Sequence, residues 1–196
     1  LNATDPAFGK QPNVILVITD DQGYAPVGRH GHPWIQTPHL DQMHDKSTRF
    51  TRFLVSPTCS PTRAALMSGR HPLKNGITHT ILERERMALK TTTLPQVLAT
   101  AGYTSGIFGK WHLGSTPEFC PNQFGFDYSY GSLAGGVDPY SHRYKEGEWS
   151  YTWHRNGELV DVRGHVTDLI ANEAIEWIEQ QKGPWFAYVP FTAVHT

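Results

Sequence analysis

Residues 14–23 read Val-Ile-Leu-Val-Ile-Thr-Asp-Asp-Gln-Gly. Five apolar, mostly β-branched residues in succession are typical of a strand in a parallel sheet that is buried on both faces. The change to a polar turn at Asp20 and Asp21 marks the carboxyl end of that strand. Residues 13–19 are therefore predicted to form a buried strand, followed at once by two adjacent carboxylates.

Other segments alternate between strand and helix patterns. Further strands are predicted by apolar runs at residues 49–55, 104–108 and 185–191. Helices are predicted by caps and apolar periodicity from Thr37 onward and at residues 61–68, 94–101 and 167–181. This alternation favours an α/β fold with a mostly parallel sheet sandwiched by helices. Residues 1–12 are expected to be a flexible lead-in, and residues 115–160 long loops with short strands.

The composition of the chain favours a packed core. Of its 196 residues, 38% are hydrophobic and 18% are charged, so intrinsic disorder is not expected. The formal net charge of −1 gives no electrostatic basis for binding nucleic acid or a membrane surface. No apolar segment is long enough for a membrane span, and no apolar leader is present, so we expect any signal peptide to be absent from this sequence.

Chemically reactive residues follow several of the predicted strands. In parallel α/β sheets, ligands bind in the crevice outside the carboxyl ends of the strands. Cys59 opens the helix that follows the predicted strand at 49–55. The residues that come directly after strand ends are Asp20, Asp21, Lys110, His112 and His195. We therefore expect all of these side chains to gather at one edge of the sheet.

Asp20 and Asp21 are candidate metal ligands. Two carboxylates this close repel each other, and both remain ionised easily only if a cation holds them. Oxygen ligands suit a hard ion such as Ca²⁺ or Mg²⁺, but two carboxylates complete neither coordination shell. An Asx-type turn that caps the strand is the alternative interpretation.

Cys59 is the candidate nucleophile position. The first turn of a helix lowers a thiol pKa and stabilises anions. Pro61 favours the entry into the helix, and Arg63 lies one turn on, where it can reach Cys59 or an anion beside it. The alternatives are two unrelated structural cysteines, or a disulfide between Cys59 and Cys120.

Four segments together resemble the type I, formylglycine-dependent sulfatases of the alkaline phosphatase superfamily. Residues 59–70, Cys-Ser-Pro-Thr-Arg-Ala-Ala-Leu-Met-Ser-Gly-Arg, resemble the sulfatase signature. Residues 19–23 resemble the first calcium motif of the family, 109–114 its Lys/His motif, and 193–196 its substrate-binding histidine segment. The resemblance runs through residues 13–196 in the family's order, and residues 133–142 look closest to the arylsulfatase B (N-acetylgalactosamine-4-sulfatase) branch.

This resemblance implies an alkaline-phosphatase-like fold and the hydrolysis of sulfate esters, with a sulfated small molecule or sugar as substrate. It also implies that a separate formylglycine-generating enzyme oxidises Cys59 to Cα-formylglycine, whose hydrate is the nucleophile. The catalytic residues would be Cys59, Arg63, Lys110, His112 and His195. The metal would be Ca²⁺ rather than Mg²⁺, held by Asp20, Asp21 and the residue derived from Cys59. An extracytoplasmic location is expected.

The family's second calcium motif and a further lysine follow the segment of His195. We therefore expect residues 13–196 to be the N-terminal part of a longer catalytic domain, incomplete at its C-terminus, and residues 1–196 alone to bind calcium weakly and to be inactive. Two other functions remain open: a phosphonate or phosphate ester hydrolase on the same scaffold, and a non-catalytic ligand-binding relative. Loss of Cys59, Arg63 or Lys110 would mark the last of these, and all three are present.

Overall fold

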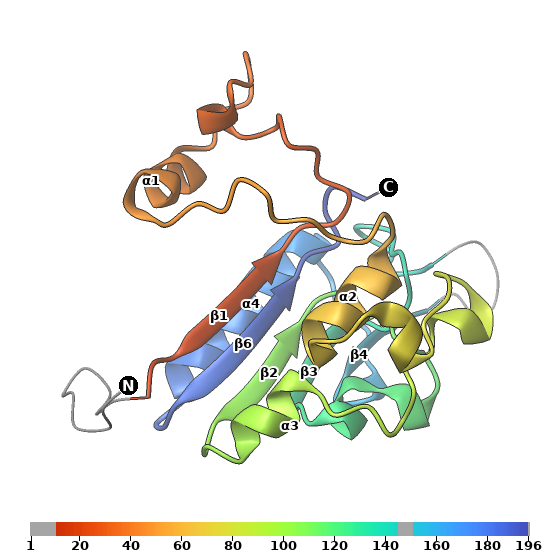
Figure 1. Cartoon of the computed structure of the whole chain (residues 1–196). Helices are drawn as coiled ribbons and strands as arrows, with labels where there is room; N and C mark the ends of the chain where they lie inside the picture. Colours follow the sequence, from red (N-terminus) through yellow and green to blue (C-terminus); the bar gives the residue numbers. More distant parts are fainter. Residues whose placement is uncertain (1–10, 145–150, 196) are drawn as a thin grey trace.

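A six-stranded sheet forms the centre of the protein (Figure 1). The computed structural model describes residues 11–144 and 151–195. The strands lie in the order β1-β6-β2-β3-β4-β5. Their bounds are β1 Val14–Ile18, β2 Thr104–Phe108, β3 Tyr128–Ser132, β4 Trp153–Arg155, β5 Glu158–Leu159 and β6 Trp185–Pro190. The first four strands in this order pair in parallel, whereas β3 with β4 and β4 with β5 pair antiparallel, which confirms the mostly parallel α/β architecture.

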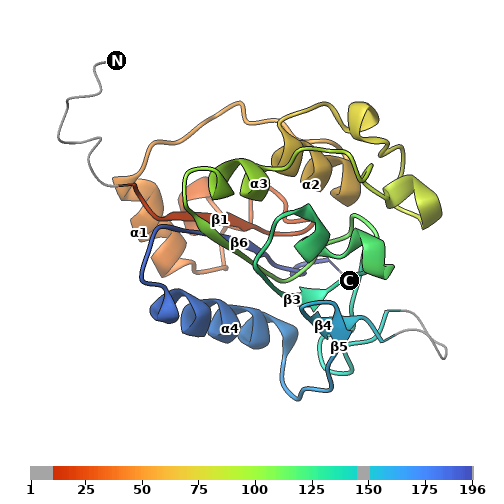
Figure 2. The same cartoon turned by 90° about the horizontal axis from the view of Figure 1, so that it is seen from below.

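Helices cover both faces of the sheet. Figure 2 shows α2 and α3 on one side and α4 on the other, with α1 beyond the end of β1 in Figure 1. Their bounds are α1 Pro38–Lys46, α2 Cys59–Ser68, α3 Leu94–Ala99 and α4 Val166–Gln180. One apolar cluster packs α2 and α3 against β2 and β6, and a second packs α4 against the opposite face of the same strands. The predicted sandwich of helices around a sheet is confirmed.

Short 3₁₀ helices occupy the long connections. They are η2 Gly28–His30, η3 Pro72–Asn75, η4 Leu82–Glu85, η5 Pro117–Phe119 and η6 Pro121–Phe124. The predicted lead-in falls mostly on residues 1–10, which lie outside the described residues, while Gln11 and Pro12 are hydrogen bonded to Ala101 and Tyr103. None of the helices in residues 11–144 and 151–195 is long and apolar enough to cross a membrane.

All four predicted helices form, with ends shifted by a few residues. Helix α2 spans Cys59–Ser68, so it begins at Cys59, the residue expected to open it, two residues before the range 61–68, and Gly69 caps its C-terminus with a φ of 64° that suits glycine. Helix α3 begins with a capping box, in which Thr93 and Gln96 satisfy each other's backbone N–H groups. Cys59 is therefore the first residue of its helix, the position at which the helix dipole acts most strongly on a side chain.

The strand predicted at residues 49–55 is wrong. These residues form an irregular connection between α1 and α2, and they pair with no strand in the described part of the chain. Their apolar side chains are largely exposed, with Phe53 at 68% and Leu54 at 90%. Alternating apolar residues form a strand only where a neighbouring strand accepts their backbone hydrogen bonds. Cys59 is consequently held in place by α2, of which it is the first residue, and not by a preceding strand.

Strand β1 is not buried on both faces as predicted. It lies at the edge of the sheet, next to β6 alone among the described strands. Val14, Leu16 and Ile18 pack on the α2 side, whereas Ile15 and Val17, on the α4 side, are each 54% exposed. Helix α4 lies over β2, β3 and β6 and leaves this face of the edge strand uncovered.

His154 on β4 predicts a specific loss of stability in acid. Its side chain is 1% exposed, and Nδ1 lies 2.7 Å from the carbonyl oxygen of Gly131, to which it donates. Burial lowers the pKa of His154 from 6.5 to about 4, despite the opposing effect of this hydrogen bond. Between pH 6.5 and about pH 4, His154 is therefore protonated in the unfolded chain but neutral in the folded protein. The free energy of unfolding consequently falls as the pH is lowered through this interval.

Between about pH 7 and pH 4.5, we expect His154 to account for about 2 kcal/mol of lost unfolding free energy. Urea unfolding of the wild type and of His154→Gln at both pH values measures this contribution. It is the amount by which the loss of unfolding free energy between the two pH values is larger in the wild type than in the variant. An equally steep pH dependence in the two proteins would show that His154 is not the group responsible.

Candidate active site

The predicted site residues converge where the parallel strands end. Asp20 follows β1 and Lys110 follows β2, while His195 follows β6. The backbone N–H of Asp20 donates to Ala193 at 2.9 Å, and that of Lys110 donates to Pro190 at 2.8 Å. These bonds tie the three strand ends together, so residues far apart in the sequence share one edge of the sheet.

Gly109 makes this close approach possible. Its φ is 129°, and a Cβ atom at this position would lie 2.0 Å from the carbonyl oxygen of Pro190. Only glycine combines this backbone conformation with this contact. The Gly109–Lys110 step therefore brings Lys110 directly against the end of β6.

Asp20, Lys110 and Arg63 form a buried charge cluster. The Lys110 ammonium contacts Asp20 Oδ2, and Arg63 Nη2 lies 3.6 Å from Asp20 Oδ1. Arg63 Nη1 also donates to the Lys110 carbonyl oxygen at 2.6 Å. All three side chains are at most 5% exposed. Two buried cations thus share one carboxylate, which leaves positive charge available for an anion.

Cys59 lies beside this cluster and beside His112. The His112 side chain is the main cause that lowers the pKa of the Cys59 thiol; burial opposes this shift, and the charge of Lys110 reinforces it. Both Cys59 and Cys120 are free thiols, so the disulfide alternative is wrong. The sequence predicts one site that contains Cys59, Arg63, Lys110 and His112, and the structure brings these four residues together.

His195 and Asp21 lie at the more open side of the site. His195 Nε2 is 3.8 Å from Asp21 Oδ2, and their side chains are 29% and 63% exposed. Asp21 adopts a left-handed backbone conformation with φ of 54°. Asp21 is therefore adjacent to Asp20 in sequence, but its carboxylate faces His195 and solvent instead of the buried cations.

Glu85 is a site residue that sequence analysis missed. It lies at the end of η4, and its Oε2 is 3.0 Å from Nε2 of His112. The carbonyl oxygen of Thr80 is 3.1 Å from the same nitrogen. In the sequence, Glu85 belongs to a run of alternating acidic and basic residues, which is usually a solvated surface. No local signal distinguishes it from its neighbour Glu83.

The carboxylates match calcium in kind but not in number. Asp20 and Asp21 supply hard oxygen donors, as Ca²⁺ requires, and Ca²⁺ takes about 6–8 of them. Asp20 already faces Lys110 and Arg63. Within residues 11–144 and 151–195, no three His, Cys, Asp or Glu side chains are grouped so as to hold a metal ion. A calcium site here needs further ligands.

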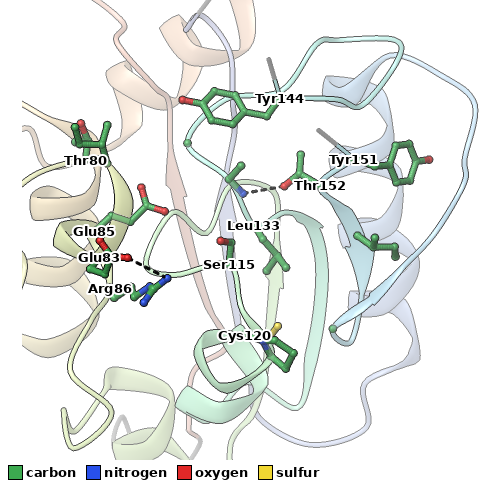
Figure 3. A pocket seen from close by; sticks show the side chains of 16 residues that line it. Thr80, Glu83, Glu85, Arg86, Ser115, Cys120, Leu133, Tyr144, Tyr151 and Thr152 are labelled. Atoms are coloured by element: carbon green, nitrogen blue, oxygen red, sulfur yellow. Dashed lines mark hydrogen bonds and ion pairs between the residues drawn. The ribbon is translucent and has the colours of Figure 1, made fainter. Parts of the chain in front are cut away.

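A cavity of about 600 Å³ lies next to this site (Figure 3). Thr80, Glu85 and Gly135, which surround the His112 ring, line one part of it, and Cys120 and Tyr151 line other parts. Cys59, Arg63, Lys110, His112 and His195 do not line it. The cavity therefore reaches the Glu85 side of His112 and not the charge cluster.

The family of the chain follows from comparison with known proteins. The sulfatase family model matches residues 12–196. N-acetylgalactosamine-6-sulfatase of Mus musculus is 34% identical over 208 residues, which cover 94% of this chain and 40% of that protein. Arylsulfatase A of Bos taurus is 44% identical over 142 residues, which cover 69% of this chain and 27% of that protein. The chain belongs to the sulfatase family.

Solved structures agree with this assignment. Ps i-CgsB in complex with k-i-k-neocarrahexaose superposes with a TM-score of 0.84 at 31% identity, covering 95% of this chain and 46% of that one. A second protein, solved with its substrate D-glucosamine-2-N,6-O-disulfate, gives a TM-score of 0.80 at 27% identity over 95% of this chain and 35% of that one. The chain thus spans less than half the length of these relatives. The relatives do not single out the arylsulfatase B branch that residues 133–142 suggested.

The charge cluster predicts different roles in stability for the two adjacent aspartates. Asp20→Asn would leave Lys110 and Arg63 buried without a counter-ion, so we expect it to lower the free energy of unfolding by about 3–5 kcal/mol. The matched variant Asp21→Asn changes an exposed carboxylate and should cost less than about 1 kcal/mol. Urea unfolding in metal-free buffer measures both. Equal losses would contradict the assigned role of Asp20.

Proposed function

We propose that the protein containing this chain hydrolyses sulfate esters, with residue 59 as the position of the nucleophile. The observation that carries this proposal is the buried cluster in which Arg63 and Lys110 share Asp20 beside Cys59. A sulfate ester is an anion whose oxygens shield the sulfur from attack. Fixed cations in a site from which water is excluded offset that charge as it develops in the transition state.

Cys59 is suited to conversion into formylglycine. It lies in the first turn of α2 and is not fully buried, so its side chain borders the site instead of the core. When hydrated, the formylglycine aldehyde supplies a hydroxyl as nucleophile and a second hydroxyl through which sulfate is released. Membership of the sulfatase family and the intact residues 59–70 support this modification.

The two site histidines lie in different surroundings, which suits two proton-transfer roles. His112 is 3% exposed and lies next to residue 59, where it holds or accepts a proton from the nucleophile's hydroxyl groups. His195 is partly exposed at the open side, where a leaving group would depart, and it is placed to donate a proton to the departing oxygen. Arg63 and Lys110 orient the sulfate between them.

Asp20 and Asp21 would hold Ca²⁺ together with the residue derived from Cys59 and with further oxygen ligands, because Ca²⁺ takes about 6–8 of them. The ion would add positive charge at the sulfate oxygens. The substrate class that we propose is a sulfated sugar or small molecule, since one similar structure was solved with a sulfated glucosamine as its substrate.

A phosphate or phosphonate ester hydrolase is the competing activity, because its substrates carry a similar tetrahedral anion. Turnover of matched aryl sulfate and aryl phosphate esters by the full-length protein distinguishes the two. We expect the sulfate ester to have the higher kcat/KM. A clear preference for phosphate would overturn the proposal.

Modification of Cys59 is directly measurable. In protein produced together with a formylglycine-generating enzyme, we expect the peptide with residue 59 to lose its thiol and to gain an aldehyde. Cys59→Ala should abolish turnover and leave the unfolding transition nearly unchanged, since the side chain lies at the start of α2. Peptide mass mapping and calorimetry measure the two effects. Finding only unmodified Cys59 in an active preparation would refute this role.

Lys110 is expected to contribute charge to the reaction. Lys110→Ala should lower kcat on the order of 10²-fold, because one of the two cations beside residue 59 is lost. Lys74→Ala, at an exposed position of η3, is the matched control and should leave kcat unchanged. Steady-state kinetics on an aryl sulfate measures both variants. A near-normal rate in Lys110→Ala would remove this residue from the mechanism.

A further inference from the structure

Glu85 is the one acidic side chain in the described residues that pairs with His112. Its Oε2 lies 3.0 Å from Nε2, across 27 positions of sequence. The His112 side chain is 4% exposed and the Glu85 side chain 15%, so the contact is largely removed from water. A hydrogen bond between a carboxylate and an imidazole is strengthened by such burial.

The His112 ring is held on several sides. A Cβ atom on Gly135 would lie 2.4 Å from both Cε1 and Nε2, so only glycine lets the ring take this position. The backbone of His112 has φ of 54°, and its N–H donates to Leu133 at 3.2 Å. The ring is consequently confined between the strand ends and η4. Its hydrogen bonds therefore determine which of its two nitrogens carries the proton.

The partners of Nε2 determine the tautomer of His112. The Thr80 carbonyl oxygen and the Glu85 carboxylate oxygen Oε2 are both acceptors, so Nε2 must carry a hydrogen, which these two acceptors share. Nδ1 is buried and makes no hydrogen bond to any side chain or backbone group in the described residues. The nitrogen left for proton transfer is therefore Nδ1.

We propose that Glu85 is a positioning residue that fixes the orientation and the Nε2–H tautomer of His112 beside residue 59. This role rests on the sulfate ester hydrolysis proposed above. Glu85 acts through His112: in the described part of the chain its hydrogen bond and ion pair go to His112, and none is found to Cys59, Arg63 or Lys110. Carboxylates that orient a metal-binding histidine commonly affect metal affinity or activity by about 10- to 100-fold, and we expect an effect of the same order on His112.

The nearby charged residue Arg86 pairs with Glu83, whereas Glu85 pairs with His112. The adjacent Arg86 lies 3.9 Å from Glu83 and over the Phe119 ring at 5.6 Å. Glu83, in the same 3₁₀ helix, has a side chain that is 73% exposed.

Kinetics of the full-length protein on an aryl sulfate test the role. Glu85→Ala should lower kcat about 10- to 100-fold and change KM less than about threefold. Glu85→Gln keeps an oxygen acceptor for Nε2–H and should recover most of the loss. Glu83→Ala is the matched control and should stay within about twofold of the wild type. A rise in KM at constant kcat would instead make Glu85 a substrate-binding residue.

A double-mutant cycle separates action through His112 from a general structural effect. In the His112→Ala background, Glu85→Ala should change kcat less than about twofold, because the group that it positions is gone. The same fold-loss in both backgrounds would overturn the proposal.

The ring nitrogens give a readout that does not depend on turnover. In ¹⁵N NMR, the signals that disappear in His112→Ala identify this residue. We expect the wild type to show the Nε2–H tautomer and Glu85→Ala to show a mixture or the Nδ1–H form. An unchanged tautomer in Glu85→Ala would refute the positioning role. Absence of sulfate ester turnover in the wild type would refute the proposed function alone, because the tautomer is measured independently.

Discussion

The buried ion cluster of Asp20, Lys110 and Arg63 constrains the rest of this structure. Removing three charges from water costs several kcal/mol for each, and their mutual attraction compensates only if the geometry is held closely. The cluster joins the end of β1, the end of β2 and the first turns of α2. The positions of these elements relative to one another are therefore fixed, because the Asp20 carboxylate must stay between the Lys110 and Arg63 cations.

Parallel strand pairing is what allows this cluster to form. All carboxyl ends of β1, β6 and β2 lie at one edge, so each connection that follows contributes a side chain to the same place. The backbone bonds of Asp20 to Ala193 and of Lys110 to Pro190 extend the sheet pairing by one step. The register of the strands therefore sets the geometry of the site.

Local patterns predicted the elements that have strong local signals. Strand β2 has the predicted bounds, and α2 begins at Cys59, the residue expected to open it, two residues before the range 61–68. Residues 49–55 have a strand pattern but no partner strand in the part of the chain that the structure describes, and their exposed side chains show that such a pattern forms a strand only beside a neighbour. The edge position of β1 could not be predicted from the sequence either, because an apolar run has the same pattern whether one face of the strand is covered or both.

The sequence by itself determined which chemistry is present: a thiol at the start of a helix, an arginine one turn on, and aspartates, a lysine and histidines after strand ends. These assignments are local, because they depend on residue type and on spacing within a few positions. Only the tertiary structure decided the partners. Asp20 meets Lys110 across 90 positions, and Glu85 meets His112 across 27. Such pairs arise from strand order and loop path, to which no local periodicity corresponds, and they determine which carboxylate is buried, which is exposed and which orients a histidine.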